Sequence, residues 1–389
     1  MYLPSPIFLL LDLACWHQVS EVNHNLKDTQ DKDSPEESQQ TMETGIVSGD
    51  LNSPNTDAEE PEELTLSNVT ILGSGSFAGQ MVDIVIQGAY IAEINASEPA
   101  ELNQENRWMI PAFIDSHVHF AYLPKSKEML DGGICAAVDL SSPESFLFED
   151  ITPMQMIYSG PMITSELGYP TQSWGAAGYG IQCSTADCVV SNIEELHSKG
   201  ATVIKIPLVE PLLEDDLLTV GVERSHTLGL KVVSHAMNDN VVQLAAQMNM
   251  DVLAHCPTSY LSDQTIELWS SRTLIPTLNA FGGSSTAVDN LRRFHEAGTT
   301  ILYGTDFGND NQVGIHSEEI ELMLNAGMTP SQIIASATSI PASYWGLENL
   351  GLIQEGYHAS FLLYSSNPLE NPSILSHPDE IWIDGIQRK

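Results

Sequence analysis

The segment spanning residues 109–120, MIPAFIDSHVHF, ends with two histidines, His117 and His119, that are separated by one residue. In a β-strand, residues i and i+2 point to the same face, so a strand here directs both imidazoles toward one point. Two imidazoles aimed at one point are suited to bind a divalent metal ion. An isolated His-x-His is more often a coincidence or part of a core, so the interpretation depends on the rest of the chain.

A lysine inside a later apolar run, Lys205 in residues 202–208, also requires an explanation. An unpaired ammonium group is costly to bury. A lysine whose amine has been carboxylated by CO₂ is instead an anion that can bridge two metal ions. A lysine whose long side chain reaches solvent is the ordinary alternative.

Three further apolar runs end on residues that can bind a metal ion: His235, His255 and Asp306. Taken alone, each histidine is more often a core or surface residue, and an aspartate more often caps a helix. Together with the two earlier histidines and the lysine, they bring six metal-binding side chains to runs typical of strands. Chance would rarely produce this pattern.

The elements that must position these residues alternate between apolar, strand-like runs and helical segments, which is typical of a parallel α/β fold. The helical segments that end at Gly200 and Gly298 are the clearest. An open, doubly wound sheet is the competing architecture, but no Gly-rich phosphate loop follows the first strand. We therefore predict a (β/α)₈ TIM-like barrel, in which functional groups lie at the C-terminal ends of the strands. The expected strands span residues 110–119, 132–140, 155–164, 202–208, 231–237, 251–256, 273–280 and 299–306.

Short β-like runs flank the barrel region on both sides. We expect residues 64–109 and 347–389 to form one small β-sandwich beside a barrel of residues 110–346. Residues 19–63 are acidic and rich in Ser, Asn, Gln and Pro, which predicts a disordered linker. Residues 1–18 hold a short apolar run followed by Cys15. This segment is either a signal with a lipid anchor on Cys15, which predicts a periplasmic or membrane-anchored protein, or an extension without function on a cytoplasmic protein.

The composition restricts the partners of the protein. The 389 residues carry 52 acidic side chains against 14 Lys and Arg, a formal net charge of −38, which argues against nucleic-acid binding because phosphates would be repelled. The expected partner is a small-molecule substrate, and a homo-oligomer is an option. Cys183 and Cys188 could form a disulfide in an oxidising compartment, whereas Cys135 and Cys256 are expected to be reduced core thiols.

The order His-x-His, Lys, His, His, Asp on strands one, four, five, six and eight resembles that of the metal-dependent amidohydrolase superfamily in its two-metal form. Residues 110–115, IPAFID, are similar to the family's Pro-Gly-Phe/Leu-Ile-Asp approach to the first strand, with Ala112 in place of the usual glycine. Residues 200–206 and 303–306 resemble runs of the imidazolonepropionase-like and Xaa-Pro dipeptidase-like branch. C-terminal runs also resemble the family, although Ser360 stands where an aspartate is usual.

The resemblance, which covers about residues 64–389, implies two divalent metal ions, with zinc the expected identity. It implies that His117, His119 and Asp306 bind the first ion and that His235 and His255 bind the second. A carboxylated Lys205 would bridge the two ions together with a hydroxide. Asp306 would be the catalytic residue that moves a proton from the attacking hydroxide to the leaving group.

The substrate is less well defined by the sequence. Asp115 and Thr305 are candidates for orienting the metal-binding residues, or have a purely structural role. No arginine lies at a predicted strand C-terminus, which disfavours strongly anionic substrates, although His316 could serve. We favour cleavage of an amide, cyclic amide or peptide-like C–N bond, with an esterase or lactonase, or a catalytically silent metal-binding surface protein, as alternatives. The residues expected to form the walls of the substrate site are Tyr122, Tyr169, Trp174, Asn279, Phe281 and Phe307.

Overall fold

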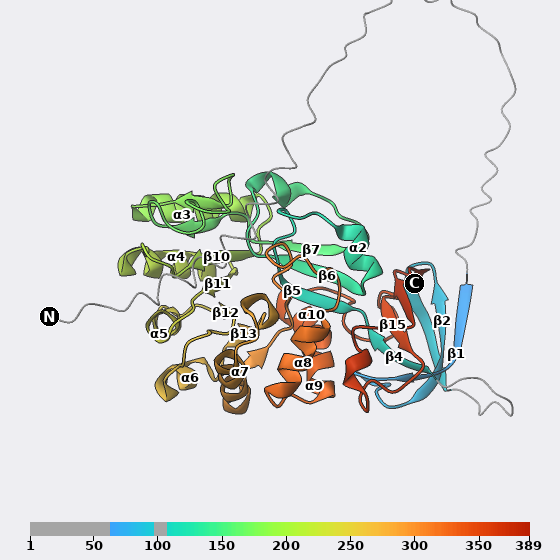
Figure 1. Cartoon of the computed structure of the whole chain (residues 1–389). Helices are drawn as coiled ribbons and strands as arrows, with labels where there is room; N and C mark the ends of the chain where they lie inside the picture. The colour runs from blue at the N-terminus through green and yellow to red at the C-terminus, as the bar shows by residue number, and fades with distance from the viewer. Residues whose placement is uncertain (1–62, 97–106) are drawn as a thin grey trace, which may run out of the picture. The chain divides into compact units, whose positions relative to one another are not determined.

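The computed structural model describes residues 63–96 and 107–389, and two groups of parallel strands, one of three and one of five, form its central part (Figure 1). All pairs within each group are parallel, for example with Lys205 opposite Val233. The strands are β5 (Phe113–Val118), β6 (Ile134–Asp139), β7 (Gln155–Tyr158), β10 (Val203–Pro207), β11 (Lys231–His235), β12 (Val252–Ala254), β13 (Thr273–Ile275) and β14 (Thr300–Ile301).

Backbone hydrogen bonds join the two groups of strands along both of their edges. Thr202, just before β10, donates its N–H to the carbonyl of Tyr158 at the end of β7, at 3.4 Å. On the other side, Ser116 of β5 donates to Tyr303, and Asp306 donates to His117, each at 2.9 Å. The eight strands therefore form a closed ring, and the predicted TIM-like α/β barrel is confirmed.

Helices follow most of the barrel strands along the chain. Their apolar residues are spaced to cover the barrel: α3 buries Val189, Ile193 and Leu196, which recur at three- and four-residue intervals. Gly298 ends α7 with a left-handed φ of 95°, as its sequence position predicts. The helices are α2 (Ser126–Asp131), α3 (Ala186–Ser198), α4 (Asp215–Thr227), α5 (Asp239–Gln247), α6 (Asp263–Trp269), α7 (Ser285–Ala297), α8 (Ser317–Asn325), α9 (Pro330–Ala337) and α10 (Ser339–Trp345), with 3₁₀ segments η2 (Glu144–Phe148), η3 (Asn279–Phe281) and η4 (Pro372–Ile374).

The third predicted strand, residues 155–164, is interrupted in the structure. β7 ends at Tyr158, and a second strand, β8 (Met162–Thr164), packs against β10 and pairs with β9 (Gly180–Gln182). Gly160 has a φ of +67°, and Pro161 has no N–H to donate, so the strand cannot continue in the same direction. The predicted third strand is therefore two short strands, and residues 165–179 connect the second of them to β9.

Both ends of the described chain build one seven-stranded sheet beside the barrel, as predicted for the flanking β-structure. The C-terminal strand β15 pairs antiparallel with β4, so residues about 250 positions apart meet. The sheet encloses a core of its own that includes Val69, Ile84 and Phe361. Its strands, in spatial order, are β17 (Ile386–Gln387), β16 (Glu380–Ile383), β15 (Phe361–Tyr364), β4 (Arg107–Pro111), β1 (Glu63–Ile71), β2 (Met81–Gln87) and β3 (Tyr90–Ala96).

Several predictions concern residues outside the described part of the chain. The signal segment, the lipid anchor at Cys15 and nearly all of the acidic linker lie there and stay predictions. The boundaries proposed for the barrel and for the two parts of the flanking domain also stay predictions. Within residues 63–96 and 107–389, none of the helices is both long and apolar enough to cross a membrane.

Candidate functional site

The six residues predicted to bind metal lie on barrel strands or just beyond their C-terminal ends. His117 belongs to β5, and His119 is the first residue after it. Lys205 is the central residue of β10, and His235 is the last residue of β11. All of the six except the half-buried His235 are at least 97 % buried, so the side chains face the interior at one end of the barrel.

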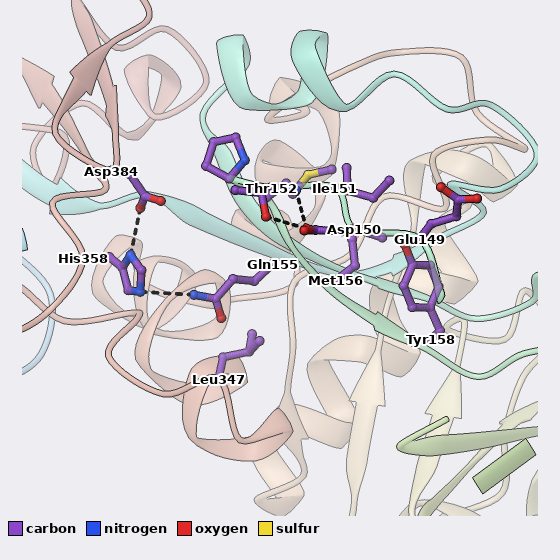
Figure 2. Close-up of a pocket in the computed structure, with 12 residues that line it drawn as sticks. Glu149, Asp150, Ile151, Thr152, Gln155, Met156, Tyr158, Leu347, His358 and Asp384 are labelled. Carbon is purple, nitrogen blue, oxygen red and sulfur yellow. Dashed lines mark hydrogen bonds and ion pairs between the residues drawn. The ribbon is translucent and has the colours of Figure 1, made fainter. Parts of the chain in front are cut away.

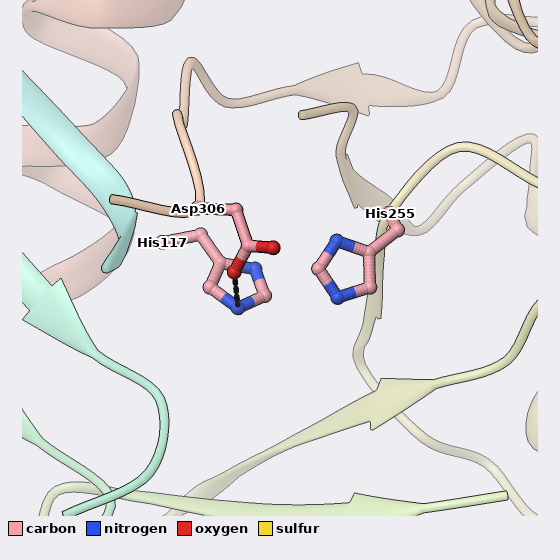
Figure 3. Close-up of side chains that lie close together, drawn as sticks. All are labelled: His117, His255 and Asp306. Atoms are coloured by element: carbon pink, nitrogen blue, oxygen red, sulfur yellow. Dashed lines mark ion pairs between the residues drawn. The ribbon is translucent and has the colours of Figure 1, made fainter. Parts of the chain in front are cut away.

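The remaining two residues, His255 and Asp306, complete a compact group with His117 (Figure 3). One possible ligand atom from each of these three side chains lies within 4.8 Å of the others. The carboxylate Oδ1 of Asp306 is 3.4 Å from His117 Nε2 and 3.2 Å from His119 Nε2. The ring centroids of His235 and His255 are 4.7 Å apart. The four imidazoles and the carboxylate therefore gather in one place.

This grouping does not decide how the six residues divide between two metal ions. The arrangement expected from the family resemblance assigns His117 and Asp306 to one metal ion and His255 to the other. The compact group contains members of both sets, with the His117 and His255 rings 4.5 Å apart. The structure thus brings the predicted residues together, while their division between two ions stays a prediction.

Several polar atoms of this group are buried without a hydrogen-bond partner. They are both ring nitrogens of His117, Nδ1 of His119 and Nζ of Lys205. Burying a polar atom without a partner costs free energy, and native structures rarely do so without a functional reason. Binding a metal ion would give these imidazole nitrogens, the amine and the carboxylate a partner and so offset this cost. The residues present therefore fit a metal site.

Burial also sets the protonation of these side chains. It lowers the pKa of His117 and of His255 well below the ordinary value and that of His235 to about 3, with the charge of Lys205 contributing to each shift. The same burial lowers the pKa of Lys205 to about 7, partly offset by the carboxylate of Asp306. The imidazoles of His117, His235 and His255 are therefore neutral, as metal binding requires, and the amine of Lys205 loses its charge near neutral pH.

Asp115 and Thr305 connect the two strands that close the barrel. The buried carboxylate of Asp115 accepts the N–H of His117 at 3.1 Å and both the N–H and the hydroxyl of Thr305, at 3.1 and 2.5 Å. Burial raises the pKa of Asp115 to about 7, although these hydrogen bonds act in the opposite direction. Asp115 thus holds the strand that carries His117 against the segment that carries Asp306, which is a positioning role.

The backbone at the site is strained and closely packed. His255 has a φ of +74° and Asp306 a φ of +60°, both in the left-handed region. A Cβ added to Gly304 would lie 2.5 Å from Ile275 and 3.1 Å from the Cβ of His117. A Cβ added to Gly308, whose φ is +108°, would lie 2.6 Å from the carbonyl oxygen of His119. Such strain persists only where the surrounding structure holds the chain in place.

Two functional residues were missed by the sequence reasoning. The hydroxyl of Thr277 forms a 2.7 Å hydrogen bond with Nδ1 of His255, which leaves Nε2 of this imidazole free to bind a metal ion. Asp139 ends β6 and accepts the N–H groups of Ala121 and Ser141, so it fixes the turn that follows His119. Asp139 ends a predicted strand, as Asp306 does, and this signal could have identified it. Nothing in the sequence indicates Thr277.

The predicted wall residues divide into two classes. Trp174, Tyr169 and Phe281 contact the imidazoles of the site, as described below, and Tyr122 contacts Trp174. Asn279 donates its side-chain amide to Asp310. Phe307 does not form a wall, because it is 99 % buried in the barrel core, next to Val118 of β5. His316, proposed as an anion contact, instead pairs its Nε2 with the carbonyl of Gln312.

The disulfide that the sequence allows is present in the structure. Cys183, directly after β9, forms a disulfide with Cys188 in the first turn of α3. Cys135 and Cys256 are free and buried, as predicted.

A separate cavity of about 440 Å³ lies where the barrel meets the seven-stranded sheet (Figure 2). His358 and Asp384 line it and form a 2.9 Å ion pair, and His358 also contacts Gln155. Since the six predicted metal-binding residues do not line this cavity, we place the functional site at the histidine group instead.

Comparisons with known proteins agree with this placement. Residues 209–386 match the family described as "Amidohydrolase family". An uncharacterized protein of Mycobacterium tuberculosis is 22% identical over 323 residues, covering 72% of this chain and 84% of that protein. An imidazolonepropionase of Cutibacterium acnes is 24% identical over 340 residues, covering 72% and 82%.

Solved structures with the same fold include hydrolases. A Xaa-Pro dipeptidase with bound methionine superposes with a TM-score of 0.68 at 18% identity, covering 84% of this chain and 99% of that one. The ochratoxinase of A. niger superposes with a TM-score of 0.66 at 17% identity, covering 85% and 96%. The predicted resemblance, and with it the predicted class of enzyme, is confirmed by these findings, in which residues 209–386 match the amidohydrolase family.

Proposed function

We propose that the protein is a metal-dependent hydrolase that cleaves a C–N bond in an amide, a cyclic amide or a peptide-like substrate. The observation that carries this proposal is the buried group of His117, His255 and Asp306, whose ligand atoms lie within 4.8 Å of one another. The amidohydrolase-family match supports it. Relatives described as an adenine deaminase and an imidazolonepropionase act on C–N bonds, which is further support.

The site would hold two divalent metal ions, with zinc the expected identity. His117, His119 and Asp306 would bind one ion, His235 and His255 the other, and carboxylated Lys205 would bridge them. The buried Nζ of Lys205 has no hydrogen-bond partner, and its pKa near 7 makes an uncharged amine available to react with CO₂. When bound, the metal ions polarise the substrate carbonyl and lower the pKa of water.

Within this site, Asp306 is the group that moves the proton. Its carboxylate is buried beside His117 and His119, and the side-chain amide of Asn309 lies 3.3 Å from Oδ1. A carboxylate held in this way can accept a proton from the attacking water and deliver it to the leaving nitrogen. Thr277 keeps the imidazole of His255 in one orientation and one tautomer while this occurs.

The experiment that tests the function measures metal content and hydrolysis on the same preparation. The purified protein is loaded with Zn²⁺ and bicarbonate and screened with N-acyl amino acids, dipeptides and cyclic amides, each beside an ester of the same acyl group. We expect two metal ions per chain and a preference for amides. Faster cleavage of the esters would favour an esterase or lactonase. A chain without metal and without hydrolysis would refute the proposal and favour a catalytically silent surface protein.

A histidine outside the site provides a matched control. His226 lies on α4 and pairs with Asp251 at 2.9 Å, at a partly exposed position. We expect His255→Asn to lose bound metal and activity, whereas His226→Asn keeps both. Equal losses in the two variants would indicate a general loss of folding rather than a metal site.

We also propose that the protein is exported and carries a lipid on Cys15, which lies outside the described residues. The disulfide between Cys183 and Cys188 supports this proposal, since such bonds persist in oxidising compartments. We expect the protein in the membrane fraction and Cys15→Ser in the soluble fraction. A wild-type protein found in the soluble fraction with an unmodified Cys15 would favour the cytoplasmic alternative.

A further inference from the structure

Three aromatic side chains, from two segments of the chain, contact the imidazoles of the site. The ring centroid of Trp174 lies 4.9 Å from that of His119, and the ring of Tyr169 lies 5.3 Å from that of His235. The ring of Phe281 lies 4.6 Å from that of His255 and 6.4 Å from that of His235. All three aromatic residues are half-buried.

The first of these segments connects β8 to β9 and carries Tyr169 and Trp174. The indole N–H of Trp174 donates to the hydroxyl of Tyr169 at 2.8 Å, so the two rings hold one another in place. The Trp174 ring also packs edge-on against Tyr179 and Tyr122. A Cβ added to Gly175 would lie 2.4 Å from the Pro170 ring, which shows how tightly this segment is folded.

The second segment is η3, and a buried carboxylate fixes its position. Glu319 of α8 is fully buried and accepts the N–H groups of Leu278 and Asn279, at 2.9 and 2.7 Å. The side-chain amide of Asn279 donates to Asp310 at 3.0 Å. Phe281 is therefore carried by a short segment that is held at two points before any substrate binds.

Charges around the site disfavour an anionic substrate group. The half-buried Asp310 accepts the side-chain amide of Asn279 in η3, and Lys205 belongs to the metal-binding group. Lys125, in the loop after β5, is the other lysine that follows a barrel strand closely in sequence. The arginines lie on the flanking sheet, on helices or at the start of β13: Arg107, Arg224, Arg272, Arg292, Arg293 and Arg388.

We propose that Tyr169, Trp174 and Phe281 form an aromatic clamp that binds a flat, uncharged aromatic group of the substrate next to the scissile amide. Two aromatic rings attract each other in offset or edge-to-face geometry, and rings fixed in advance lose little conformational entropy on binding. Because arginine forks are absent from the described strand ends, a carboxylate on the aromatic group would find no arginine partner there. The inference rests on the proposed hydrolase function and narrows its substrates to neutral aromatic amides.

The test compares substrates that differ only in a phenyl or a cyclohexyl ring. N-benzoylglycinamide is matched with N-cyclohexanecarbonylglycinamide, and N-benzylacetamide with N-(cyclohexylmethyl)acetamide, so that either side of the amide can carry the ring. We expect kcat/KM to favour phenyl by about 2- to 12-fold in at least one pair, mostly through KM. N-(4-carboxybenzoyl)glycinamide should be a poorer substrate than its uncharged parent.

Variants test whether the aromatic clamp causes the preference for phenyl substrates. Trp174→Leu and Phe281→Leu should reduce the phenyl preference to near unity, while Tyr90→Leu, a substitution of an exposed tyrosine on β3, should leave it unchanged. Metal content measured on each variant excludes a loss of the site itself. Equal turnover of phenyl and cyclohexyl substrates in both pairs, a preference that survives both clamp variants, or a preference for the carboxylated substrate would overturn the proposal.

A binding measurement separates failure of the clamp from failure of the hydrolase function. Metal-free protein is titrated with N-benzoylglycinamide and with its cyclohexyl counterpart, and tryptophan fluorescence is recorded. Tighter binding of the phenyl compound, with a signal that disappears in Trp174→Leu, supports the clamp even if no compound is hydrolysed. Hydrolysis with equal binding of both compounds refutes the clamp and leaves the hydrolase function standing.

Discussion

Thr277→Val should weaken metal binding although Thr277 itself binds no metal. The substitution replaces a hydroxyl by a methyl group of similar size, so it removes the 2.7 Å hydrogen bond to Nδ1 of His255 and little else. A buried polar atom left without its partner costs about 1–3 kcal/mol. Removing a group that orients a metal-binding imidazole lowers metal affinity by about 10- to 100-fold, which is the same range of free energy.

The assay is a Zn²⁺ competition titration against a chromophoric chelator, combined with urea unfolding of the metal-free protein. We expect the Zn²⁺ affinity of Thr277→Val to fall by about 10- to 100-fold and its stability to fall by about 1–3 kcal/mol. Thr277→Ser keeps the hydroxyl and should retain most of the affinity. Wild-type affinity in the valine variant, or an equal loss in the serine variant, would refute the view that this hydrogen bond orients His255.

Four further predictions concern the same region. Asp306→Asn should retain much of the bound metal but lose about 10²- to 10⁴-fold in kcat, measured beside metal content, and substantial retained turnover would refute its role in proton transfer. Reactivation of metal-free protein by Zn²⁺ should require bicarbonate and slow as the pH falls through about 7, because the amine of Lys205 then gains a proton; a rate independent of bicarbonate would exclude carboxylation. Gly304→Ala should destabilise the fold by about 1–3 kcal/mol and weaken Zn²⁺ binding by moving His117, as unfolding and competition titrations would report. Burial raises the pKa of Glu319 to about 8, so between pH of about 4.5 and 8 the folded state keeps a proton that the unfolded state loses. The free energy of unfolding should therefore fall as the pH rises through this range. Glu319→Gln should show a smaller fall in urea unfolding, and an unchanged pH dependence would contradict this role of Glu319.

The barrel could be predicted because its strands are short apolar runs that are buried on both faces. The same property identifies the ends of the strands in the sequence, since His117, His235 and Asp306 are polar residues near the ends of such runs. The six candidate metal-binding residues could therefore be placed at one rim without a structure. The sequence pattern does not show which of the six side chains lie closest to one another, since that depends on side-chain direction and strand tilt.

The residues that hold the metal-binding side chains in place were harder to predict. Thr277 acts on His255 from 22 positions away, and Asp115 acts on Thr305 from 190 positions away, so neither pairing has a local signature. The sequence does not predict the interruption after β7, because the expected strand of residues 155–164 includes Gly160 and Pro161 in one apolar run. Their effect on backbone direction outweighs the apolar character of the residues on either side.

Three consecutive barrel strands, β12, β13 and β14, are followed by residues in the left-handed region: His255, Thr277 and Asp306, with φ of +74°, +43° and +60°. Each such residue costs about 1–2 kcal/mol, because its Cβ crowds the following carbonyl oxygen. Two of the three are candidate metal-binding residues and the third orients one of them, so the strain is concentrated where it turns the chain at the rim. Asparagine and aspartate tolerate this region better than most residues. Asp306→Asn therefore changes the charge of the carboxylate with little change in backbone strain, and loss of turnover in that variant reports on proton transfer rather than on the fold.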